Sequence, residues 1–594
     1  MEGNKCCIID EKFSMKRGKK MKKWMIYSKR ADFEAIGKAY SIDKVIARVI
    51  RNRDVVGEEN IRRYLYGTKE DMYDPYLLKD MEKAVAILKE KIFLKKKIRI
   101  IGDYDIDGVS SIYILLTAFQ KCGALVDGEI PHRIKDGYGI NEGLIQDAYQ
   151  AGVDTIVTCD NGIAAESQIA YAKSLGMTVI ITDHHDVPYE EKEGKKQYIL
   201  PPADAVLNPK QEDCSYPFHG LCGAAVAYKL VLGLYQVFGK AKEEAEEEFL
   251  EIVAMATIGD VMDLQDENRI IVKEGLKRLR KTKNKGLRSL MAVCRIEPEM
   301  ISSYHIGFII GPCLNAGGRL DTAKRALALL QAEEKEEADN LAGELKALNE
   351  SRKKMTADGV ELAVQKLENS GRKDDKVLVV YLPDCHESLA GIIAGRLRER
   401  YYKPVFVLTK GEEWIKGSGR SIEGYSMFDE LVKSKEYLVK FGGHPMAAGL
   451  SLKEEDIEPF RISLNQKQQM TEEDFTEKIW IDTRLPFGYI TEELVEQFAL
   501  LMPFGKGNEK PVFAERHVKL LHRQVLGAKR NVVRMLLESD NVRLEGVWFG
   551  EGDLFLEETE GVEYMSILFL PEINTFRGNQ TLQLRISEYR TEIE

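Results

Sequence analysis

Acidic residues and two histidines follow three short apolar stretches in the first half of the chain. The stretches are IRIIG, TIVTC and TVIIT. The polar residues that come after them are Asp103, Asp105, Asp107, Asp160, Asp183, His184 and His185. Carboxylates packed together repel one another and raise one another's pKa unless cations neutralise them. Oxygen ligands with one or two imidazoles suit Mn²⁺ or Mg²⁺ better than a structural zinc, so the pattern predicts a divalent-metal site.

The elements that must position these residues are predicted by the pattern of residues 80–210. Short apolar strands alternate there with segments of helical period, which indicates βαβ units and a parallel sheet covered on both faces. Ligand sites in such sheets form outside the carboxyl ends of the strands, so the acids would converge on one crevice. A single Asp after a strand is more often a turn or a helix N-cap than a ligand. Recurrence at three strand ends, with adjacent histidines, favours the metal site.

The rest of the chain predicts further domains, because 594 residues are too many for one core. Residues 219–330 are mostly helical in pattern, and residues 331–368, rich in Ala, Glu, Lys and Leu, predict a long connecting helix. A second α/β unit follows, with the glycine-rich stretches KGSGRS and FGGHPMAAG. From Ile479 onward, short β-prone stretches alternate with turns, which predicts a small antiparallel barrel or sandwich.

Composition is that of an ordinary globular protein, with 44% hydrophobic and 31% charged residues. No apolar run reaches the ~18 residues that span a membrane, and no signal peptide opens the chain. The nine cysteines form no CxxC pair, which favours reduced thiols and a cytoplasmic location. A net charge of −10 taken alone disfavours nucleic-acid binding, but a local basic groove can coexist with a negative net charge. The basic run 16–23 favours a solvated tail, and residues 1–20 are interpreted as a leader.

The chain resembles the DHH phosphoesterase superfamily in four motifs: GDYDIDGVSS, TCDNG, TDHH and ATIGDVMDL, the last of which supplies Asp260. Five further stretches narrow the resemblance to the RecJ family of bacterial single-strand-specific exonucleases. They are PHRIKDGYGI, NAGGRLDTA, GSGRS, FGGHPMAAGL and MPFGKGNEKPVF. The resemblance covers roughly residues 45–594, and the combination of motifs in this order is highly specific.

This resemblance implies roles for the strand-end residues. The metal ligands it implies are Asp105, Asp107, Asp160, His184 and Asp260, with Asp103 as a supporting ligand. Asp183 would orient or ligate from the third strand, and His185 would stabilise charge developing on the phosphate; with Asp160 they form the implied catalytic group. Many superfamily members carry a His four residues before the first ligating Asp. This chain has Ile101 there, so the second metal would be held more weakly.

The implied chemistry is metal-assisted hydrolysis. Two cations ~3.5–4 Å apart would activate a water and clamp the scissile phosphate for in-line attack. No serine or cysteine nucleophile is then needed. The sequence has no GxSxG elbow and no Walker A motif, so ATP dependence has no support.

Polar residues in and near glycine-rich stretches predict a substrate site. They are Arg133, Arg319, Ser418, Arg420 and His444. Neighbouring glycines let a ligand approach the backbone closely, although each arginine alone is more often a surface charge. The resemblance implies that Arg133, Ser418 and Arg420 recognise a 5′ phosphate through bidentate guanidinium and hydroxyl contacts. Arg319 and His444 would hold the backbone near the scissile bond.

The C-terminal β region resembles an oligonucleotide-binding fold, which holds single strands by stacking and electrostatics. Candidate contacts are Arg516, His517, His522, Arg523, Lys529, Arg530, Trp548 and Phe549. For the two aromatic residues, a place in the barrel core is favoured slightly over base stacking.

The predicted fold class is α/β, in five segments. They are an N-terminal leader or extension (1–44), a parallel-sheet DHH catalytic domain (45–330), a long connecting helix (331–370), a second α/β, DHH-associated domain (371–465) and an OB-fold-like nucleic-acid-binding domain (466–594).

The resemblance implies a cytoplasmic, Mn²⁺- or Mg²⁺-dependent 5′→3′ exonuclease that acts on single-stranded DNA in repair and recombination. It would act as a monomer that does not associate with a membrane, with a helicase and a single-strand-binding protein as possible partners. One alternative is a DHH phosphodiesterase of short oligoribonucleotides or cyclic dinucleotides, but such chains usually lack a long C-terminal β region. Another is a non-catalytic replication scaffold that binds single-stranded DNA, which would have lost several metal acids.

Overall fold

The chain forms two compact units. The computed structural model describes residues 7–8, 22–133, 136–137, 139–192, 194–576 and 578–592. The central unit comprises Gly67–Gln468 and Gly505–Gly507. The terminal unit comprises Met1–Tyr66, Gln469–Phe504 and Asn508–Glu594. The predicted leader, residues 1–20, lies outside the described residues except for Cys7 and Ile8.

A five-stranded parallel sheet organises the first half of the central unit, as the alternating pattern predicted. Its order is β4 (Leu125–Glu129), β3 (Lys97–Ile101), β5 (Thr155–Cys159), β6 (Thr178–Thr182) and β9 (Ala205–Leu207). Alternate strand residues bury on opposite faces: Ile98 and Ile100 join one apolar cluster, whereas Ile101 joins the other. Both faces of the sheet therefore need a helical cover.

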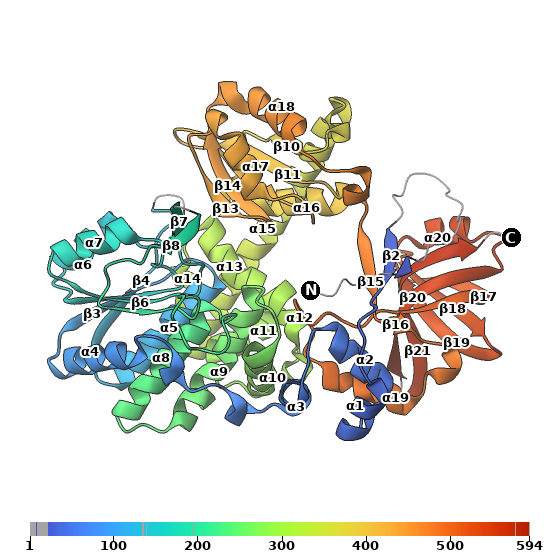
Figure 1. Ribbon diagram of the computed structural model, residues 1–594, viewed down its shortest axis with the longest axis horizontal. Helices are drawn as coiled ribbons and strands as arrows, with labels where there is room; N and C mark the ends of the chain where they lie inside the picture. The colour runs from blue at the N-terminus through green and yellow to red at the C-terminus, as the bar shows by residue number, and fades with distance from the viewer. Residues whose placement is uncertain are drawn as a thin grey trace. The chain divides into compact units, whose positions relative to one another are not determined.

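Helices supply that cover on both faces (Figure 1). One face is covered by α4 (Met81–Phe93), α5 (Ile106–Lys121) and α8 (Gly223–Val237), and the other by α6 (Glu142–Gln150) and α7 (Glu166–Ser174). A short hairpin, β7 (Tyr189–Lys192) and β8 (Lys195–Tyr198), follows β6. The next helices are α9 (Lys242–Gly259), α10 (Asp266–Leu279), α11 (Lys285–Val293), α12 (Ser303–His305), a π-helical turn (Ile306–Ile310), α13 (Gly311–Leu320) and α14 (Lys324–Gln331).

The expected long helix is α15 (Lys335–Asn369), which leads to a second α/β part of the same unit. Its buried residues Ala338, Ala342 and Leu345 recur at helical spacing. The sheet that follows has the order β10 (Leu378–Tyr381), β11 (Val405–Lys410), β12 (Ile415–Arg420), β14 (Ala447–Leu452) and β13 (Lys440–His444). Only β10 and β11 pair in parallel. Its helices are α16 (Ala390–Tyr401), α17 (Met427–Lys433) and α18 (Ile457–Lys467).

A closed five-stranded barrel dominates the terminal unit. Its strands are β17 (Phe513–Leu526), β18 (Val532–Ser539), β19 (Val542–Phe549), β21 (Asn579–Glu592) and β20 (Tyr564–Phe576), and β17 closes onto β20. The expectation of a wholly antiparallel barrel is wrong at one point, because β19 pairs with β21 in parallel. Helix α20 (Gly552–Glu558) and β20 lie between those two strands in the chain and provide the crossover that a parallel pair needs.

The N-terminal helices share the core of this barrel unit. They are α1 (Phe33–Tyr40), α2 (Lys44–Asn52) and α3 (Glu58–Tyr66). A buried ion pair holds α2 to the barrel side: Arg53 Nη1 lies 2.8 Å from Asp482 Oδ1. The other elements of the unit are β1 (Cys7–Ile8), β2 (Lys23–Ile26), β15 (Lys478–Ile481), β16 (Thr483–Arg484) and α19 (Glu492–Gln497). Residues 44–66 thus contact the barrel, although the sequence placed residue 45 at the start of the catalytic domain.

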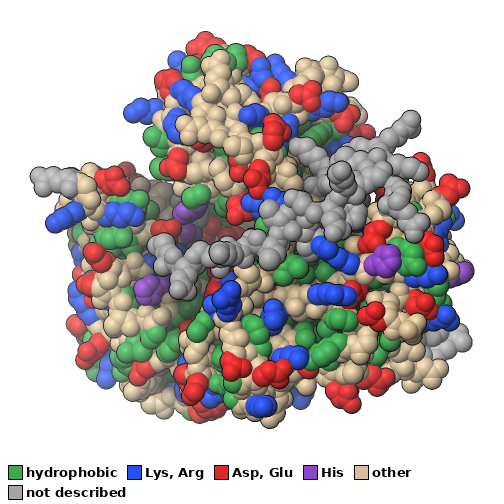
Figure 2. Space-filling view, turned by 45° about the vertical axis from the view of Figure 1, so that its right-hand side comes forward, with side chains coloured by type: hydrophobic (Ala, Val, Ile, Leu, Met, Phe, Trp, Pro, Cys, Tyr) green, Lys and Arg blue, Asp and Glu red, His purple; other side chains and the backbone are tan. Residues whose placement is uncertain are grey.

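The surface agrees with the mixed composition. On the face drawn in Figure 2, acidic and basic side chains are interspersed rather than gathered into separate areas. Across the part of the chain that the structure describes, no helix is both long and apolar enough to span a bilayer.

Candidate metal centre and substrate site

The loop after β3 is ordered by its own acids. Asp105 caps the N-terminus of α5, and its Oδ1 accepts hydrogen bonds from the backbone N–H groups of Asp107 (2.9 Å) and Gly108 (3.2 Å). A Cβ at Gly108 would lie 2.4 Å from the backbone oxygen of Asp103, so only glycine lets the loop close this tightly. The N-cap role that a lone Asp suggests is therefore present, and it leaves other carboxylate oxygens available.

Asp107 is fixed by α8, a helix that was not predicted to take part in the site. Its carboxylate is fully buried and accepts backbone hydrogen bonds from Gly223 N (2.6 Å) and Ala224 N (2.8 Å) at the start of α8. A Cβ at Gly223 would lie 2.7 Å from Asp160 Cβ. The only signal in the sequence was a glycine at the beginning of an apolar helix, in LCGAAVAY.

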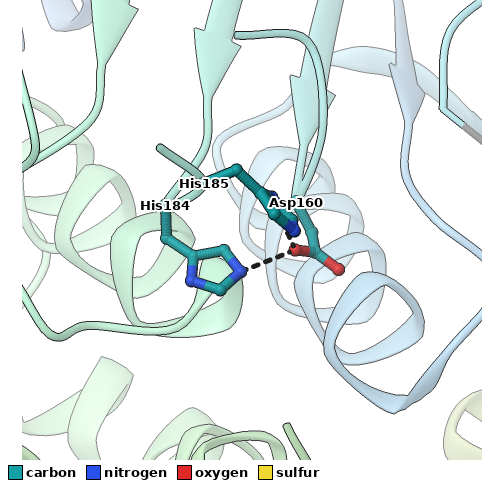
Figure 3. A group of neighbouring side chains, drawn as sticks. All are labelled: Asp160, His184 and His185. Carbon is teal, nitrogen blue, oxygen red and sulfur yellow. Dashed lines mark ion pairs between the residues drawn. The ribbon is translucent and has the colours of Figure 1, made fainter. Parts of the chain in front are cut away.

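Asp160, His184 and His185 meet at the ends of β5 and β6. Asp160 adopts a left-handed φ of 59°, which non-glycine residues adopt uncommonly, although Asp does so more readily than most. Both imidazoles point toward its carboxylate (Figure 3): His184 Nε2 lies 3.1 Å from Asp160 Oδ1, and His185 Nδ1 lies 3.9 Å from it. Asp107 Oδ2 and Asp260 Oδ2 each lie 3.6 Å from His184 Nε2. Residues far apart in sequence thus form one cluster.

The cluster divides into overlapping sets of potential metal ligands, each with its ligand atoms within 4.8 Å of one another. The sets are Asp103, Asp105 and Asp160; Asp107, His184 and Asp260; and Asp160, His184 and His185. Asp160 belongs to two of them. All six residues predicted to be metal ligands lie in these sets, and the distances allow more than one cation.

Unsatisfied polar atoms and shifted pKa values show that the cluster suits a cation. Asp103 Oδ1 and His184 Nδ1 are buried and, among the described residues, have no hydrogen-bond partner, and the buried His184 Nε2 faces carboxylates without an aligned hydrogen bond. Burial, and then the neighbouring acids, raise the pKa of Asp103 and Asp160 well above the ordinary range and that of Asp260 to about 8. Burial lowers the pKa of His184, so its imidazole is neutral and can ligate. A divalent cation would satisfy these atoms and offset the repulsion.

Asp183 has little capacity left for a metal. Its Oδ1 accepts from His184 N (2.7 Å), His185 N (3.1 Å) and His185 Nδ1 (2.8 Å), and its Oδ2 accepts from Ile163 N (2.9 Å). Burial alone would raise the pKa of Asp183, but its bond with His185 lowers it to about 2. Burial alone would lower the pKa of His185, but the same bond raises it to about 9. The geometry therefore favours Asp183 as the residue that orients a protonated His185.

The predicted arginines come together beside the metal cluster. Arg133 lies with its guanidinium carbon 4.7 Å from the ring centroid of Tyr104, and Arg319 Nη1 donates to Ser388 O (3.0 Å). Burial, followed by the charge of Arg133, lowers the pKa of Arg319 to about 10. Burial, then Arg398 and Arg133, also lowers the pKa of Arg420. These cations repel one another, and an anion between them would relieve the repulsion.

Ser418 and Arg420 lie on β12 against the first turn of α16. Arg420 Nη1 lies 3.2 Å from Ser418 Oγ and donates to Gly419 O at 2.7 Å. Gly391 of α16 was not among the predicted site residues, yet a Cβ there would lie 2.7 Å from Arg420 Nη2 and 2.9 Å from Ser418 Oγ. A glycine inside a helix gives no local pattern in the sequence that would predict a place in a binding site. Glycine at this position keeps the space in front of the two polar groups open.

His444 lies at the end of β13 and faces the loop after the histidine pair. Its side chain is 66% exposed, and its Nδ1 lies 3.9 Å from Asp186 Oδ2. Asp186 directly follows His185 in the chain. All five residues predicted to bind substrate are therefore in the central unit, and His444 adjoins the metal cluster.

The two barrel aromatics differ in environment. Trp548 is buried and packs against Phe555 and Tyr589, as the core interpretation expected. Phe549 is 54% exposed, and the guanidinium of Arg585 lies 5.1 Å from its ring centroid. Of the predicted basic contacts, Arg530 pairs with Asp553, and His517 stacks on Tyr564.

Comparison with known proteins gives matches along nearly the whole chain. Family models match residues 97–257 (DHH family, N-terminal domain), 374–469 (DHHA1 domain) and 481–588 (RecJ OB domain). A single-stranded-DNA-specific exonuclease RecJ of Bacillus subtilis is 36% identical over 554 residues, covering 92% of this chain and 68% of the relative. The protein of the same name from Haemophilus influenzae is 33% identical over 572 residues, covering 93% of this chain and 97% of the relative.

Solved structures show the same similarity. RecJ of Thermus thermophilus in complex with Mn²⁺ superimposes with a TM-score of 0.80 at 25% identity, covering 96% of this chain and 80% of that one. An exonuclease RecJ bound to manganese superimposes with a TM-score of 0.56 at 31% identity, covering 66% of this chain and 94% of that one.

Proposed function

The chain belongs to the RecJ family of single-stranded-DNA-specific exonucleases, and we propose that its strand-end acids and arginine cluster together degrade single strands from the 5′ end. Membership makes it a metal-dependent exonuclease that uses Mn²⁺ or Mg²⁺. One observation carries the assignment of the site: a group of buried acids with raised pKa values adjoins a group of arginines with lowered pKa values within one compact unit.

The acids would hold two cations. Asp103, Asp105 and Asp160 would hold one, and Asp107, Asp160, His184 and Asp260 the other. The bound ions would supply Lewis acidity and an activated water for in-line attack on the phosphodiester. The backbone amides of Gly223 and Ala224 keep Asp107 oriented whether or not a substrate is present.

His185 would act on the phosphate rather than on the ions. Its Nδ1 is bound to Asp183, and the opposite nitrogen of a protonated ring would donate to a phosphate oxygen as charge develops there. Asp183 fixes the ring orientation through this bond and two backbone bonds on the same oxygen.

The arginine cluster would set the polarity of cleavage. A terminal phosphate carries more charge than an internal phosphodiester, so it gains most from Arg133, Arg420 and the Ser418 hydroxyl. Arg319 and His444 would hold the backbone between that terminus and the ions. A 5′ terminus carries such a phosphate, whereas an ordinary 3′ terminus carries a hydroxyl, so cleavage would proceed 5′→3′.

The decisive experiment uses the full chain, Mn²⁺ and strands labelled at the 5′ or the 3′ end. We expect label at the 5′ end to be released first from a single strand, with a blunt duplex left intact. Release of the 3′ label first would contradict the proposed polarity, and equal attack on the duplex would contradict the proposed substrate.

We also propose a cellular setting. Work in DNA repair and recombination is typical of the family, and the seven cysteines from Cys122 to Cys385 form no disulfide, which supports a cytoplasmic enzyme. Without a Walker A motif, the chain would depend on a helicase to open a duplex and on a single-strand-binding protein to present the strand.

We propose that it acts as a monomer, because both clusters lie in one chain; a dimer in analytical ultracentrifugation would contradict this.

A further inference from the structure

Two aromatic side chains lie exposed on a helical run of the central unit. Residues 303–320 run through α12, the π-helical turn and α13. On the inward side, Ile306 and Ile310 are buried, whereas Tyr304 and Phe308 are 60% and 69% exposed. Their ring centroids lie 5.1 Å apart with 31° between the planes. Rings of this size usually bury most of their surface, so the core does not explain them.

The aromatic pair lies next to the segment that carries Asp260. A Cβ at Gly307, between the two aromatic residues, would lie 3.6 Å from Ile258 Cγ2, two residues before Asp260. A Cβ at Gly311 would lie 3.5 Å from Ile106 Cδ1, directly after Asp105. The run therefore packs beside the segments that carry Asp260 and Asp105, and its two aromatic rings remain exposed there.

The same run reaches the arginine cluster at its other end. Arg319 is part of α13, and at a rise of ~1.5 Å per residue it lies roughly 20 Å along the run from Tyr304. A strand whose 5′ end is held beside Arg319 and Arg420 would cross the ions and then leave past the aromatic pair. The polarity argument thus assigns the pair to nucleotides on the 3′ side of the scissile bond.

A basic side chain lies close to the same Asp260 segment. Lys506 is half-exposed, and its Nζ lies 3.3 Å from Asp263 Oδ1. Its backbone oxygen accepts a hydrogen bond from Leu264 N (2.7 Å), so the Gly505–Gly507 loop is fixed just after Asp260. An ammonium group here adds the charge complementarity to a phosphate backbone that a purely apolar protein contact would not need.

We propose that Tyr304 and Phe308 form a stacking platform for bases of the single strand several nucleotides to the 3′ side of the scissile bond. This inference rests on the proposed function. Every base offers a π-face, so such a platform binds without sequence preference, as an exonuclease that degrades any strand requires. The platform would hold the strand between successive cuts.

The test compares Tyr304→Ala, Phe308→Ala and the double variant with wild type and with Phe93→Ala. Phe93 is 84% exposed at the end of α4, on an element that packs against α8, and it serves as the matched control. Affinity is measured in EDTA for 5′-phosphorylated strands of about 20 and about 3 nucleotides, the shorter being unable to reach the platform. A 2-aminopurine placed at successive positions reports stacking by its quenching.

We expect each alanine substitution to weaken binding of the long strand about 5-fold or more, and to weaken binding of the short strand by a smaller factor. Quenching of 2-aminopurine fluorescence at one position on the 3′ side should disappear in the double variant. The Phe308→Trp variant, which keeps an aromatic ring there, should retain the quenching. Wild-type affinity in the double variant, or equal loss for both lengths, would overturn the platform. Failure of the wild type to degrade single strands would instead overturn the proposed function, so the two failures are distinguishable.

Discussion

The metal cluster and the arginine cluster solve opposite forms of one electrostatic problem. At the strand ends, buried carboxylates outnumber cations, and burial and mutual repulsion raise the pKa of Asp103, Asp160 and Asp260. Around β12, guanidinium groups outnumber acids, and burial and repulsion lower the pKa of Arg319 and Arg420. Each cluster is costly by itself, and its sign identifies the ligand that would offset the cost.

The clusters also differ in how they are built. The acids lie on rigid strand and helix ends, and backbone amides at the start of α8 hold Asp107. The arginines come from a loop, a helix and a strand, and Arg319 reaches the second α/β part through Ser388 O. Rigid placement suits ions that demand fixed distances, whereas separate elements suit the recognition of a strand that must move on after each cut.

Asp160→Ala should give the largest effect, because Asp160 belongs to two of the three ligand sets. We expect turnover of single-stranded DNA with Mn²⁺ to fall about a thousandfold or more, beyond the ~10–100-fold typical for loss of a residue that only orients a ligand. Binding of the strand should persist, while calorimetry should show weaker Mn²⁺ binding. The control is Asp213→Ala, an exposed acid paired with Lys79; near-normal turnover in Asp160→Ala would falsify the metal centre.

Arg420→Ala should remove the preference for a 5′ phosphate. A charged hydrogen bond contributes about 1.5–3 kcal/mol, so we expect kcat/KM for phosphorylated strands to fall about 10- to 100-fold while that for dephosphorylated strands changes little. The ratio of the two substrates is the measurement. Arg396→Ala, an exposed arginine of α16 paired with Glu399, is the control. If Arg420→Ala keeps the ratio of the wild type, the phosphate lies elsewhere.

Gly391→Ala tests the same pocket without removing a charge. The added Cβ would lie 2.7 Å from Arg420 Nη2 and 2.9 Å from Ser418 Oγ, so it would displace them or the phosphate. We expect KM for phosphorylated strands to rise about 5- to 10-fold, as for ~1 kcal/mol of crowding. At Gly395 of the same helix an added Cβ meets nothing within 4 Å, so Gly395→Ala should leave KM unchanged. Equal behaviour of the two variants would contradict the pocket.

The two clusters could not be predicted equally well from the sequence. The acids and histidines from Asp103 to His185 stand directly after apolar strands, and parallel topology brings strand ends together, so local pattern was sufficient to predict that part of the metal cluster. Asp260, at the end of α9, was predicted only from the family resemblance. Gly223 and Ala224 support Asp107 from 116 and 117 residues away, and Arg53 meets Asp482 across 429 residues. Such contacts leave no periodic signal, because each depends on how separate elements pack. For the same reason Gly391 was missed, whereas Arg420, in a glycine-rich stretch, was found.

A buried acid outside the metal cluster offers a comparison with the strand-end acids. Its expected effect, on stability alone, is the smallest of those predicted. Glu251 of α9 is buried and accepts a hydrogen bond from Thr282 Oγ1 (2.6 Å). Burial raises its pKa to about 7 from an ordinary value of 4.5. Among the described residues, Glu251 belongs to no group of potential metal ligands, so it is expected to take up a proton instead. Its contribution to stability is full below pH 4.5 and is lost as pH rises through 7.

Glu251→Gln should therefore stabilise the protein in a pH-dependent way. The neutral amide keeps an oxygen for Thr282 and removes the buried charge, so we expect unfolding at pH 8 to cost about 1–3 kcal/mol more than in wild type, with little difference at pH 5. Chemical denaturation at the two pH values measures this. Glu247→Gln, at an exposed acid of the same helix paired with Lys283, should show no such pH dependence. Equal stabilisation at both pH values would mean that Glu251 stays ionised, and that a lone buried acid in this unit does not need the cation that the strand-end acids require.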